Sequence, residues 1–383
     1  MGDPEVIDWV EGGEDRSARW RSESGAPPPR QMAIVDDTLT ADQAYGLACQ
    51  GTALLWRGDF QNARQMLTAM AKRADRQPRK AKKAAAPPPP ADAFHLHRQA
   101  QSQRARTLGM LLVELDEDYT IALRRAPAVR QACVEAWGPA DVPTVVSLRE
   151  LLGLIGAHEW RSKGIPIQAL GGSIHPHYGV FTPIRREYLD LVAQAPLPGL
   201  VSSNSLAFDI GTGTGVIAAL LVRRGIRRVI ATDQDPRALA CARDNVSRLG
   251  IGGKVEVVEA DLFPEGRAAL VVCNPPWVPA RPSTPIERGI YDPESGMLRG
   301  FLAGLGAHLL PGGEGWLILS DLAEHLGLRT REELLSAVEA AGLKVVDRLD
   351  ARPKHPKASD ADDPLHAARS AEITSLWRLA VRE

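Results

Sequence analysis

From about residue 175 onward, short apolar runs alternate with segments of helical periodicity. This alternation is typical of a parallel α/β sheet, because each buried strand is followed by a crossover helix. Seven runs are predicted to be strands: 205–210, 228–233, 254–259, 268–273, 315–320, 343–350 and 372–381. No long helical stretch separates the last two. They are therefore predicted to form a C-terminal antiparallel hairpin in a seven-stranded, Rossmann-like sheet.

The chain before residue 175 differs in charge, hydrophobicity and periodicity. Residues 1–35 combine many charges with low hydrophobicity and no period, which predicts a disordered tail. Residues 36–165 hold several helical stretches, which predict a smaller, mostly helical N-terminal domain that serves substrate recognition. Segment 79–93 is rich in basic residues, alanine and proline, so a flexible loop is expected there. Residues 175–383 then form the α/β domain.

Composition and charge exclude several classes of protein. The chain is 44% hydrophobic and 24% charged with a net charge of −1, which is ordinary for a globular protein and argues against a general polyanion-binding surface. The N-terminus lacks an apolar signal segment, and no run approaches the roughly 18 apolar residues of a membrane span. The four cysteines and nine histidines show no metal-binding spacing. We therefore expect a cytoplasmic protein with no membrane contact and no metal.

One local exception is the stretch from Lys72 to Arg106, which carries ten basic and two acidic residues. Such a patch can attract phosphate backbones, or it can be a solvated helix face next to a charged linker. Few aromatic residues lie between the charges, which favours the second interpretation slightly.

A glycine-rich turn follows the apolar run 206–210. Gly211, Gly213 and Gly215 lack Cβ atoms, so the backbone can turn sharply and approach a ligand closely. The helix that begins there presents N–H groups and a positive dipole end to a carboxylate or phosphate. The fingerprint G-x-G-x-x-G of dinucleotide enzymes does not match, because Val216 stands where its third glycine would be. A tight turn without a ligand is the alternative.

Three acidic residues surround this turn in the sequence. Asp233 ends the next predicted strand, where an acid can accept hydrogen bonds from both hydroxyls of a ribose. Asp209 precedes the turn, and Asp261 follows the third strand, from where it can reach an adenine amino group while Leu262 walls the ring. Asp261 is alternatively a simple loop acid or helix cap.

The second informative motif is Asn274-Pro-Pro-Trp277, which follows the apolar run 269–273. The side-chain oxygen of Asn274 and the carbonyl of Pro275 provide two acceptors for one planar NH2 group, and such a pair aims its lone pair. The two prolines keep the segment rigid. Trp277 offers a flat face for a planar acceptor. The alternative is an Asn-Pro turn at a strand end.

Together, Asp209 to Gly215, Asp233, Asp261 and Asn274 to Trp277 resemble the motifs of class I S-adenosylmethionine-dependent methyltransferases that act on amide or exocyclic nitrogens. Val180-Phe-Thr-Pro183 and Tyr291 to Gly296 make the HemK-type glutamine N5-methyltransferases the nearest likeness. The resemblance covers about 200 residues, from 175 onward.

The resemblance implies S-adenosylmethionine as the cofactor and a role for each matching residue. The turn from Gly211 to Gly215 would hold its methionine end, Asp233 its ribose and Asp261 its adenine, while Thr182 would cover it. Asn274 and Pro275 would hold the target NH2, and Trp277 would stack on it. Two departures are notable: HemK-type enzymes usually carry tyrosine at the position of Trp277, and adenine N6-methyltransferases share the N-P-P-aromatic motif.

Three functions follow as hypotheses. The first is methylation of a glutamine side chain in a translation factor or ribosomal protein. The second is N6 methylation of adenine in RNA or DNA, with the basic stretch guiding the nucleic acid. The third is a non-catalytic module that binds S-adenosylmethionine or RNA. The sequence leaves the oligomeric state open.

Overall fold

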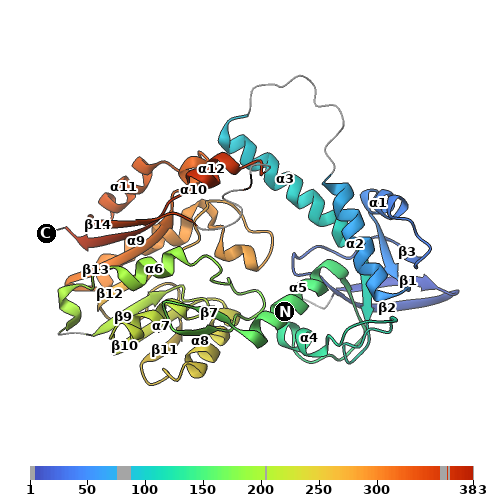
Figure 1. Cartoon of the computed structure of the whole chain (residues 1–383), viewed down its shortest axis with the longest axis horizontal. Helices are drawn as coiled ribbons and strands as arrows, with labels where there is room; N and C mark the ends of the chain where they lie inside the picture. Colours follow the sequence, from blue (N-terminus) through green and yellow to red (C-terminus); the bar gives the residue numbers. More distant parts are fainter. Residues whose placement is uncertain (1–4, 76–87, 203–204, 354–359, 361–362, 383) are drawn as a thin grey trace. The chain divides into compact units, whose positions relative to one another are not determined.

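The computed structural model of the 383-residue chain describes residues 5–75, 88–202, 205–353, 360 and 363–382. The chain divides into two compact units (Figure 1). The first comprises Met1–Pro88 with His95–Glu159, and the second comprises Pro89–Phe94 with Trp160–Glu383. Each unit has a sheet of its own.

The second unit is built on a seven-stranded mixed sheet, which confirms the predicted α/β class. Its spatial order is β11-β10-β9-β12-β13-β15-β14. The five strands from β11 to β13 are parallel, and β15 runs antiparallel to both β13 and β14. The strands are β9 (Leu206–Ile210), β10 (Arg228–Asp233), β11 (Val255–Glu259), β12 (Ala268–Cys273), β13 (Leu309–Ser320), β14 (Leu343–Ala351) and β15 (Thr374–Val381).

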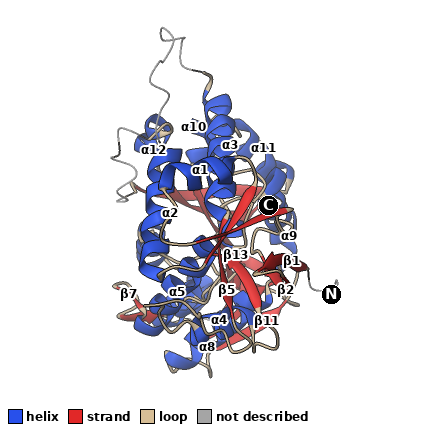
Figure 2. Ribbon diagram, turned by 90° about the vertical axis from the view of Figure 1, so that its right-hand side faces the viewer, coloured by secondary structure: helices blue, strands red, loops and turns tan. Residues whose placement is uncertain are grey.

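Helices cover both faces of this sheet (Figure 2). Alternate residues of each strand point to opposite faces, so the apolar runs supply two cores at once. In β12, for example, Leu270 and Val272 pack with α6 (Glu187–Gln194), α7 (Val216–Arg223) and α8 (Pro236–Arg248). Val271 and Cys273 pack instead with helices α9 (Gly296–His308) and α11 (Arg331–Ala340). This two-sided burial explains why the strands read as continuous apolar runs.

Shorter elements connect this framework. A separate two-stranded sheet precedes it, and the described part of its loops holds two further helices and three 3-10 helices. These elements are β7 (Ile165–Ile167), β8 (Gly172–Ile174), η1 (Gly199–Ser202), η2 (Ile286–Gly289), η3 (Pro293–Ser295), α10 (Leu322–His325) and α12 (His366–Ala371).

The first unit contains a six-stranded sheet, which the prediction of a mostly helical domain over 36–165 did not include, although helices outnumber strands in the described part of that range. The strand order is β1-β2-β6-β5-β4-β3. The three strands of this sheet within 36–165 are only four or five residues long. The sequence does not predict them reliably, because a short buried apolar run cannot be distinguished from a helical segment by periodicity. The strands of this unit are β1 (Val6–Glu11), β2 (Glu14–Arg21), β3 (Gln31–Val35), β4 (Thr52–Trp56), β5 (Leu111–Leu115) and β6 (Thr144–Ser147). Its helices are α1 (Ala41–Cys49), α2 (Phe60–Ala74), α3 (Pro90–Gly109), α4 (Arg130–Trp137) and α5 (Leu148–Lys163), of which α3 and α5 extend into the second unit.

The predicted disordered tail over 1–35 is corrected as well, because the described part of it holds strands β1, β2 and β3. Ile7 and Trp9 alternate with exposed Val6 and Asp8, and they are buried with Trp20 of β2 against strands from much later in the chain. The other face of the hairpin mixes charged side chains, such as those of Asp8 and Asp15, with exposed Val6 and Val10. The high charge of this segment therefore reflects a half-buried hairpin, which composition alone cannot distinguish from disorder.

The predicted flexible loop over 79–93 lies mostly outside the described residues, which resume at residue 88. From Pro90 onward the chain is already helical, in α3. Phe94 near the start of this helix is buried in the second unit, together with Val278 and Leu326. The end of the predicted loop is thus a packed helix.

Candidate active site

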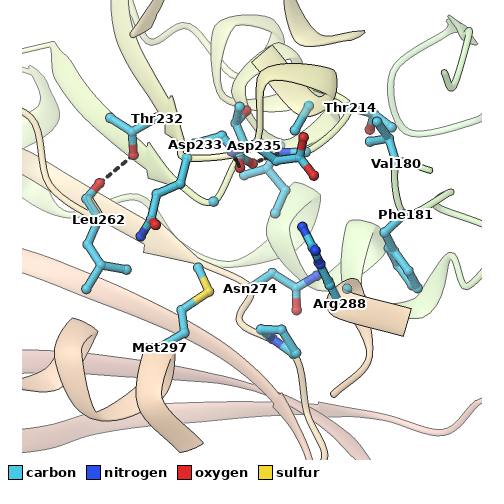
Figure 3. Close-up of a pocket in the computed structure, with 18 of the residues that line it drawn as sticks. Val180, Phe181, Thr214, Thr232, Asp233, Asp235, Leu262, Asn274, Arg288 and Met297 are labelled. Carbon is cyan, nitrogen blue, oxygen red and sulfur yellow. Dashed lines mark hydrogen bonds between the residues drawn. The ribbon is translucent and has the colours of Figure 1, made fainter. Parts of the chain in front are cut away.

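A cavity of about 650 Å³ lies in the second unit, where the parallel strands β9, β10 and β12 end. Its volume is within the range of pockets that hold a small-molecule ligand. In a parallel α/β sheet, ligands bind at the carboxyl ends of the strands, because loops rather than helices face that edge. Figure 3 shows side chains from several loops converging on this cavity.

The glycine turn forms one wall of the cavity. Gly211 and Gly213 both line it, and both have left-handed backbone conformations, with φ of 69° and 54°. A Cβ atom on Gly211 would collide with the Cε atom of Met297 from α9. Because that atom ends a flexible side chain, the left-handed conformation, more than the contact, favours glycine at this position.

Asp233 fixes the turn from the end of β10. Its carboxylate accepts hydrogen bonds from the backbone N–H groups of Gly213 and Asp235, each at 3.0 Å. Burial raises the pKa of Asp233. Asp233 lines the cavity, and each of its oxygens accepts one hydrogen bond and can accept another. The predicted ribose contact requires such an acceptor.

Asp209 lies behind the turn and does not line the cavity. Its Oδ2 accepts hydrogen bonds from the Thr212 hydroxyl (2.6 Å) and from the Ala218 N–H (3.0 Å). Its Oδ1 is buried without a hydrogen-bond partner, and burial raises the pKa of Asp209 to about 6. An unpaired carboxylate oxygen in a fully buried position is costly, which points to a cationic or hydrogen-bonding group that belongs there.

The opposite end of the cavity contains Asp261 and Leu262. The Asp261 carboxylate accepts a hydrogen bond from the Gln234 side-chain amide. Leu262 adopts a left-handed conformation with φ of 67°, and its carbonyl accepts a hydrogen bond from the Thr232 hydroxyl at 2.5 Å. These contacts hold the apolar side chain of Leu262 next to the carboxylate of Asp261. A planar ring with an amino group can pack on the first and donate a hydrogen bond to the second.

The Asn274-Pro-Pro-Trp277 segment supplies the remaining wall, through Asn274 and Pro276. Pro275 is buried and does not line the cavity. The indole Nε1–H of Trp277 donates a hydrogen bond to Oδ1 of Asn274 at 2.9 Å. Because that oxygen can accept two hydrogen bonds, the contact orients the amide and leaves one acceptor position open.

Trp277 itself does not line the cavity, and one face of its ring is covered. The guanidinium of Arg185 lies 4.8 Å from the ring centroid, and Tyr188 meets the ring edge-on at 6.5 Å. Trp277 is thus packed as an orienting side chain rather than presented as an open stacking surface on that face.

Arg185 is in turn held by two buried carboxylates. It donates to Glu187 at 2.7 Å and to Glu372 at 2.9 Å. Burial by itself would lower the pKa of Arg185, but the charges of Glu372 and Glu187 outweigh it and leave the pKa raised. A chain of contacts therefore runs from Glu372 through Arg185 and Trp277 to Asn274.

The structure brings most of the predicted site residues to one cavity, and it leaves others outside. The lining residues among them are Gly211, Gly213, Asp233, Asp261, Leu262 and Asn274. Gly215 is the N-cap of α7 and packs against Ala242 of α8. Thr182 does not line the cavity, whereas its neighbours Val180 and Phe181 do.

Sequence reasoning missed several lining residues, among them Arg288 and Met297. For Met297 a signal existed in the segment Tyr291 to Gly296. Asp292 in that segment accepts hydrogen bonds from the N–H groups of Met297 (3.1 Å) and Leu298 (3.2 Å), which caps α9 and sets Met297 against the turn. Arg288 lies in a loop without a recognisable pattern.

The residues present fit S-adenosylmethionine, the cofactor that the resemblance implies. The cavity has the required size, the glycine turn makes room for close approach, and the unpaired Oδ1 of Asp209 lies beside the turn. Within the described ranges, no group of three or more His, Cys, Asp or Glu side chains is arranged to hold a metal. Among those same residues, no helix has the length and apolarity to cross a bilayer.

Comparison with known proteins agrees with this geometry. The family model described as "Methyltransferase small domain" matches residues 172–321. The ribosomal protein L11 methyltransferase of Pelotomaculum thermopropionicum is 37% identical over 151 residues, which are 39% of this chain and 41% of that protein. The release factor glutamine methyltransferase of Cereibacter sphaeroides is 34% identical over 164 residues, covering 38% of this chain and 56% of that protein.

A longer match is to the release factor glutamine methyltransferase of Moorella thermoacetica. It is 33% identical over 205 residues, which are 46% of this chain and 72% of that protein. The chain thus spans about half the length of the first two relatives and more than two thirds of the third.

Proposed function

The chain belongs to the class I S-adenosylmethionine-dependent methyltransferases, near the HemK type, and on that premise we propose that it methylates the side-chain amide nitrogen of a glutamine in a translation-related protein. The observation that carries the proposal is the position of Asn274. Its amide lines the same cavity as Gly211 and Gly213, and its Oδ1 is oriented by Trp277.

In this proposal, the acceptor NH2 donates one hydrogen bond to Oδ1 of Asn274, and the carbonyl of Pro275, a residue that does not line the cavity in this structure, would accept the second. An amide nitrogen is planar because its lone pair is delocalised. Two convergent acceptors favour a pyramidal nitrogen and hold its lone pair in one direction. Bound S-adenosylmethionine supplies the methyl group on a sulfonium sulfur that leaves as a neutral thioether. The nitrogen loses its extra proton to water afterwards, so no strong general base is required.

The remaining predicted residues would hold the cofactor. Gly211 and Gly213 make room for its methionine end, Asp233 accepts hydrogen bonds from its ribose, and Asp261 with Leu262 accommodates its adenine. Asp209 lies behind the turn and does not line the cavity, so it would act on the ammonium group through its negative charge and not by direct contact.

A glutamine is favoured over an adenine by the surroundings of Trp277. A flipped adenine needs an open aromatic face for stacking, whereas the Arg185 guanidinium covers one face of this indole. In the basic stretch, Arg73 pairs with Asp42 at 2.6 Å and Arg104 pairs with Asp75 at 2.7 Å, so two of its charges are already compensated. The names of the relatives, which act on release factors or on ribosomal protein L11, point the same way.

The test is to incubate the full chain with tritiated S-adenosylmethionine and lysate from a strain that lacks the gene. We expect label that protease releases and nuclease does not. Mass spectrometry of the labelled band should then locate a 14 Da addition on a glutamine side chain. Label released only by nuclease would indicate the adenine reaction instead, and cofactor binding without any label would indicate the non-catalytic module.

A further inference from the structure

The described residues that line the cavity carry more negative than positive charge, and S-adenosylmethionine has charged groups of both signs. Among the described lining residues, three are acidic, namely Asp233, Asp235 and Asp261, and one is basic, namely Arg288. S-adenosylmethionine carries two positive groups, a sulfonium and an ammonium, and one negative group, a carboxylate. The acids and the buried Asp209 suit the positive groups, so the carboxylate needs a separate partner.

The glycine turn has few donors for that carboxylate because three of its N–H groups already donate within the protein. The Thr212 N–H donates to the carbonyl of Thr232 (2.8 Å), and the Gly215 N–H donates to the carbonyl of Thr212 (2.9 Å). The Gly213 N–H donates to Asp233. Helix α7 therefore begins with these donors turned inward, unlike the open anion site that a helix N-terminus often provides.

Arg288 is placed to fill this gap. It belongs to η2, whose backbone is fixed by a bond from the Arg288 N–H to the Pro285 carbonyl at 3.1 Å. The adjacent Gly289 packs against the Phe181 ring so closely that a Cβ atom there would clash. From this rigid base, the side chain extends into the cavity near Asn274 (Figure 3).

Among the described residues, the guanidinium of Arg288 makes no hydrogen bond or ion pair, and Arg288 is exposed. A guanidinium presents a planar fork of donors that matches a carboxylate in a bidentate geometry. An arginine that lines an otherwise acidic pocket without a partner is suited to an anionic ligand group.

We propose that Arg288 binds the carboxylate of the methionine moiety of S-adenosylmethionine. This assignment concerns cofactor binding and is independent of the acceptor proposed above. Arg288 would select the intact amino-acid end of the cofactor over analogues that lack the carboxylate. It would also hold that end beside Asn274, where the methyl group must be presented.

The test is a ligand comparison by isothermal titration calorimetry with the full chain. S-adenosylmethionine and its decarboxylated form differ only in the carboxylate. We expect Arg288→Gln to weaken binding of S-adenosylmethionine about 10- to 100-fold, the range for a charge-assisted pair. Binding of the decarboxylated form should stay within about twofold of wild type. Arg288→Lys should recover part of the loss.

Arg299→Gln is the matched control, because Arg299 is exposed on α9 and does not line the cavity. It should leave both affinities unchanged. Equal losses for the two ligands in Arg288→Gln would overturn the assignment, as would an unchanged affinity for S-adenosylmethionine. Because no methyl acceptor is present in the titration, its result does not depend on whether the acceptor is a glutamine.

Discussion

The two halves of the cavity are held together by different chemistry. Around the glycine turn, the backbone itself is bound, through N–H groups that donate to Asp233 and to main-chain carbonyls. Around Asn274, side chains bind side chains, from Glu372 through Arg185 and Trp277. The first arrangement depends on backbone conformation. The second depends on an ion pair, a cation–π contact and a hydrogen bond between side chains. Substitutions should therefore separate cofactor binding from methyl transfer.

The largest effect is expected at the acceptor side. Asn274→Ala removes the oriented amide oxygen and should lower kcat by about 10²- to 10³-fold, as the loss of one preorganised polar group does in other active sites. Affinity for S-adenosylmethionine should stay within about twofold, because the turn and Asp233 are untouched. Methyl incorporation and calorimetry measure the two quantities. Parallel loss of both would mean that the halves are not separable.

The glycine turn should show the opposite pattern. Gly211→Ala forces an alanine to a φ of 69° and places its Cβ against Met297. A left-handed conformation costs an ordinary residue about 1–2 kcal/mol of stability. Crowding of the cavity by the new methyl group and the displaced Met297, at about 1–2 kcal/mol, should lower cofactor affinity roughly 5- to 30-fold. Gly250→Ala is the control: its φ is 68°, it has open space around it, and it does not line the cavity. That variant should lose thermal stability but keep its affinity.

The pH dependence of cofactor binding should report Asp209. Its pKa in the folded protein is about 6, above the ordinary 3.8, so the free protein holds a proton there below about pH 6. A neutral carboxyl group attracts an ammonium less, so affinity should be about tenfold lower at pH 5 than at pH 7. Calorimetry in buffers of different ionisation enthalpy should detect proton release at pH 5.5.

Asp209→Asn should flatten this profile, and a wild-type profile that is already flat would exclude the assignment. The same raised pKa has a consequence for the free protein. Between pH 3.8 and about 6 the folded state binds a proton that the unfolded state releases. The contribution of Asp209 to stability should therefore fall as the pH rises through this window.

The smallest effect is expected from the relay behind Asn274. Arg185→Ala removes the cation over Trp277, an interaction of about 0.5–1 kcal/mol in partly exposed settings, so kcat should fall roughly two- to fivefold with no change in cofactor affinity. It also leaves the buried carboxylates of Glu187 and Glu372 without their cation, which lowers the melting temperature. Arg185→Ala combined with Glu372→Gln should melt higher than Arg185→Ala alone, and a lower melting point would contradict the pairing.

The features predicted correctly from the sequence are those that act locally along the chain. Glycines at Gly211 and Gly213 signal a turn because their backbone freedom is intrinsic. The apolar runs of the second unit signal strands because both of their faces are buried. Asn274 follows such a strand, so its place at the carboxyl edge of the sheet follows from the same pattern.

Other features depend on which distant segments meet. The hairpin of β1 and β2 carries charged side chains on one face, and its buried face becomes recognisable only when it packs on strands such as β6. Neither Arg185 nor Arg288 lies in a sequence motif that predicts a contact with Trp277 or with the cavity. Arg185 matters because the fold puts it over Trp277, and Arg288 because the fold puts it among three carboxylates.

The sequence by itself determined the α/β class, the glycine turn and the place of Asn274 at the carboxyl edge of the sheet, because backbone conformation and strand burial depend on short stretches of residues. Tertiary structure alone decided the sheet of the first unit, the covered face of Trp277 and the single cation among the described residues of the cavity wall. These depend on contacts between residues far apart in the chain, for which no local pattern exists.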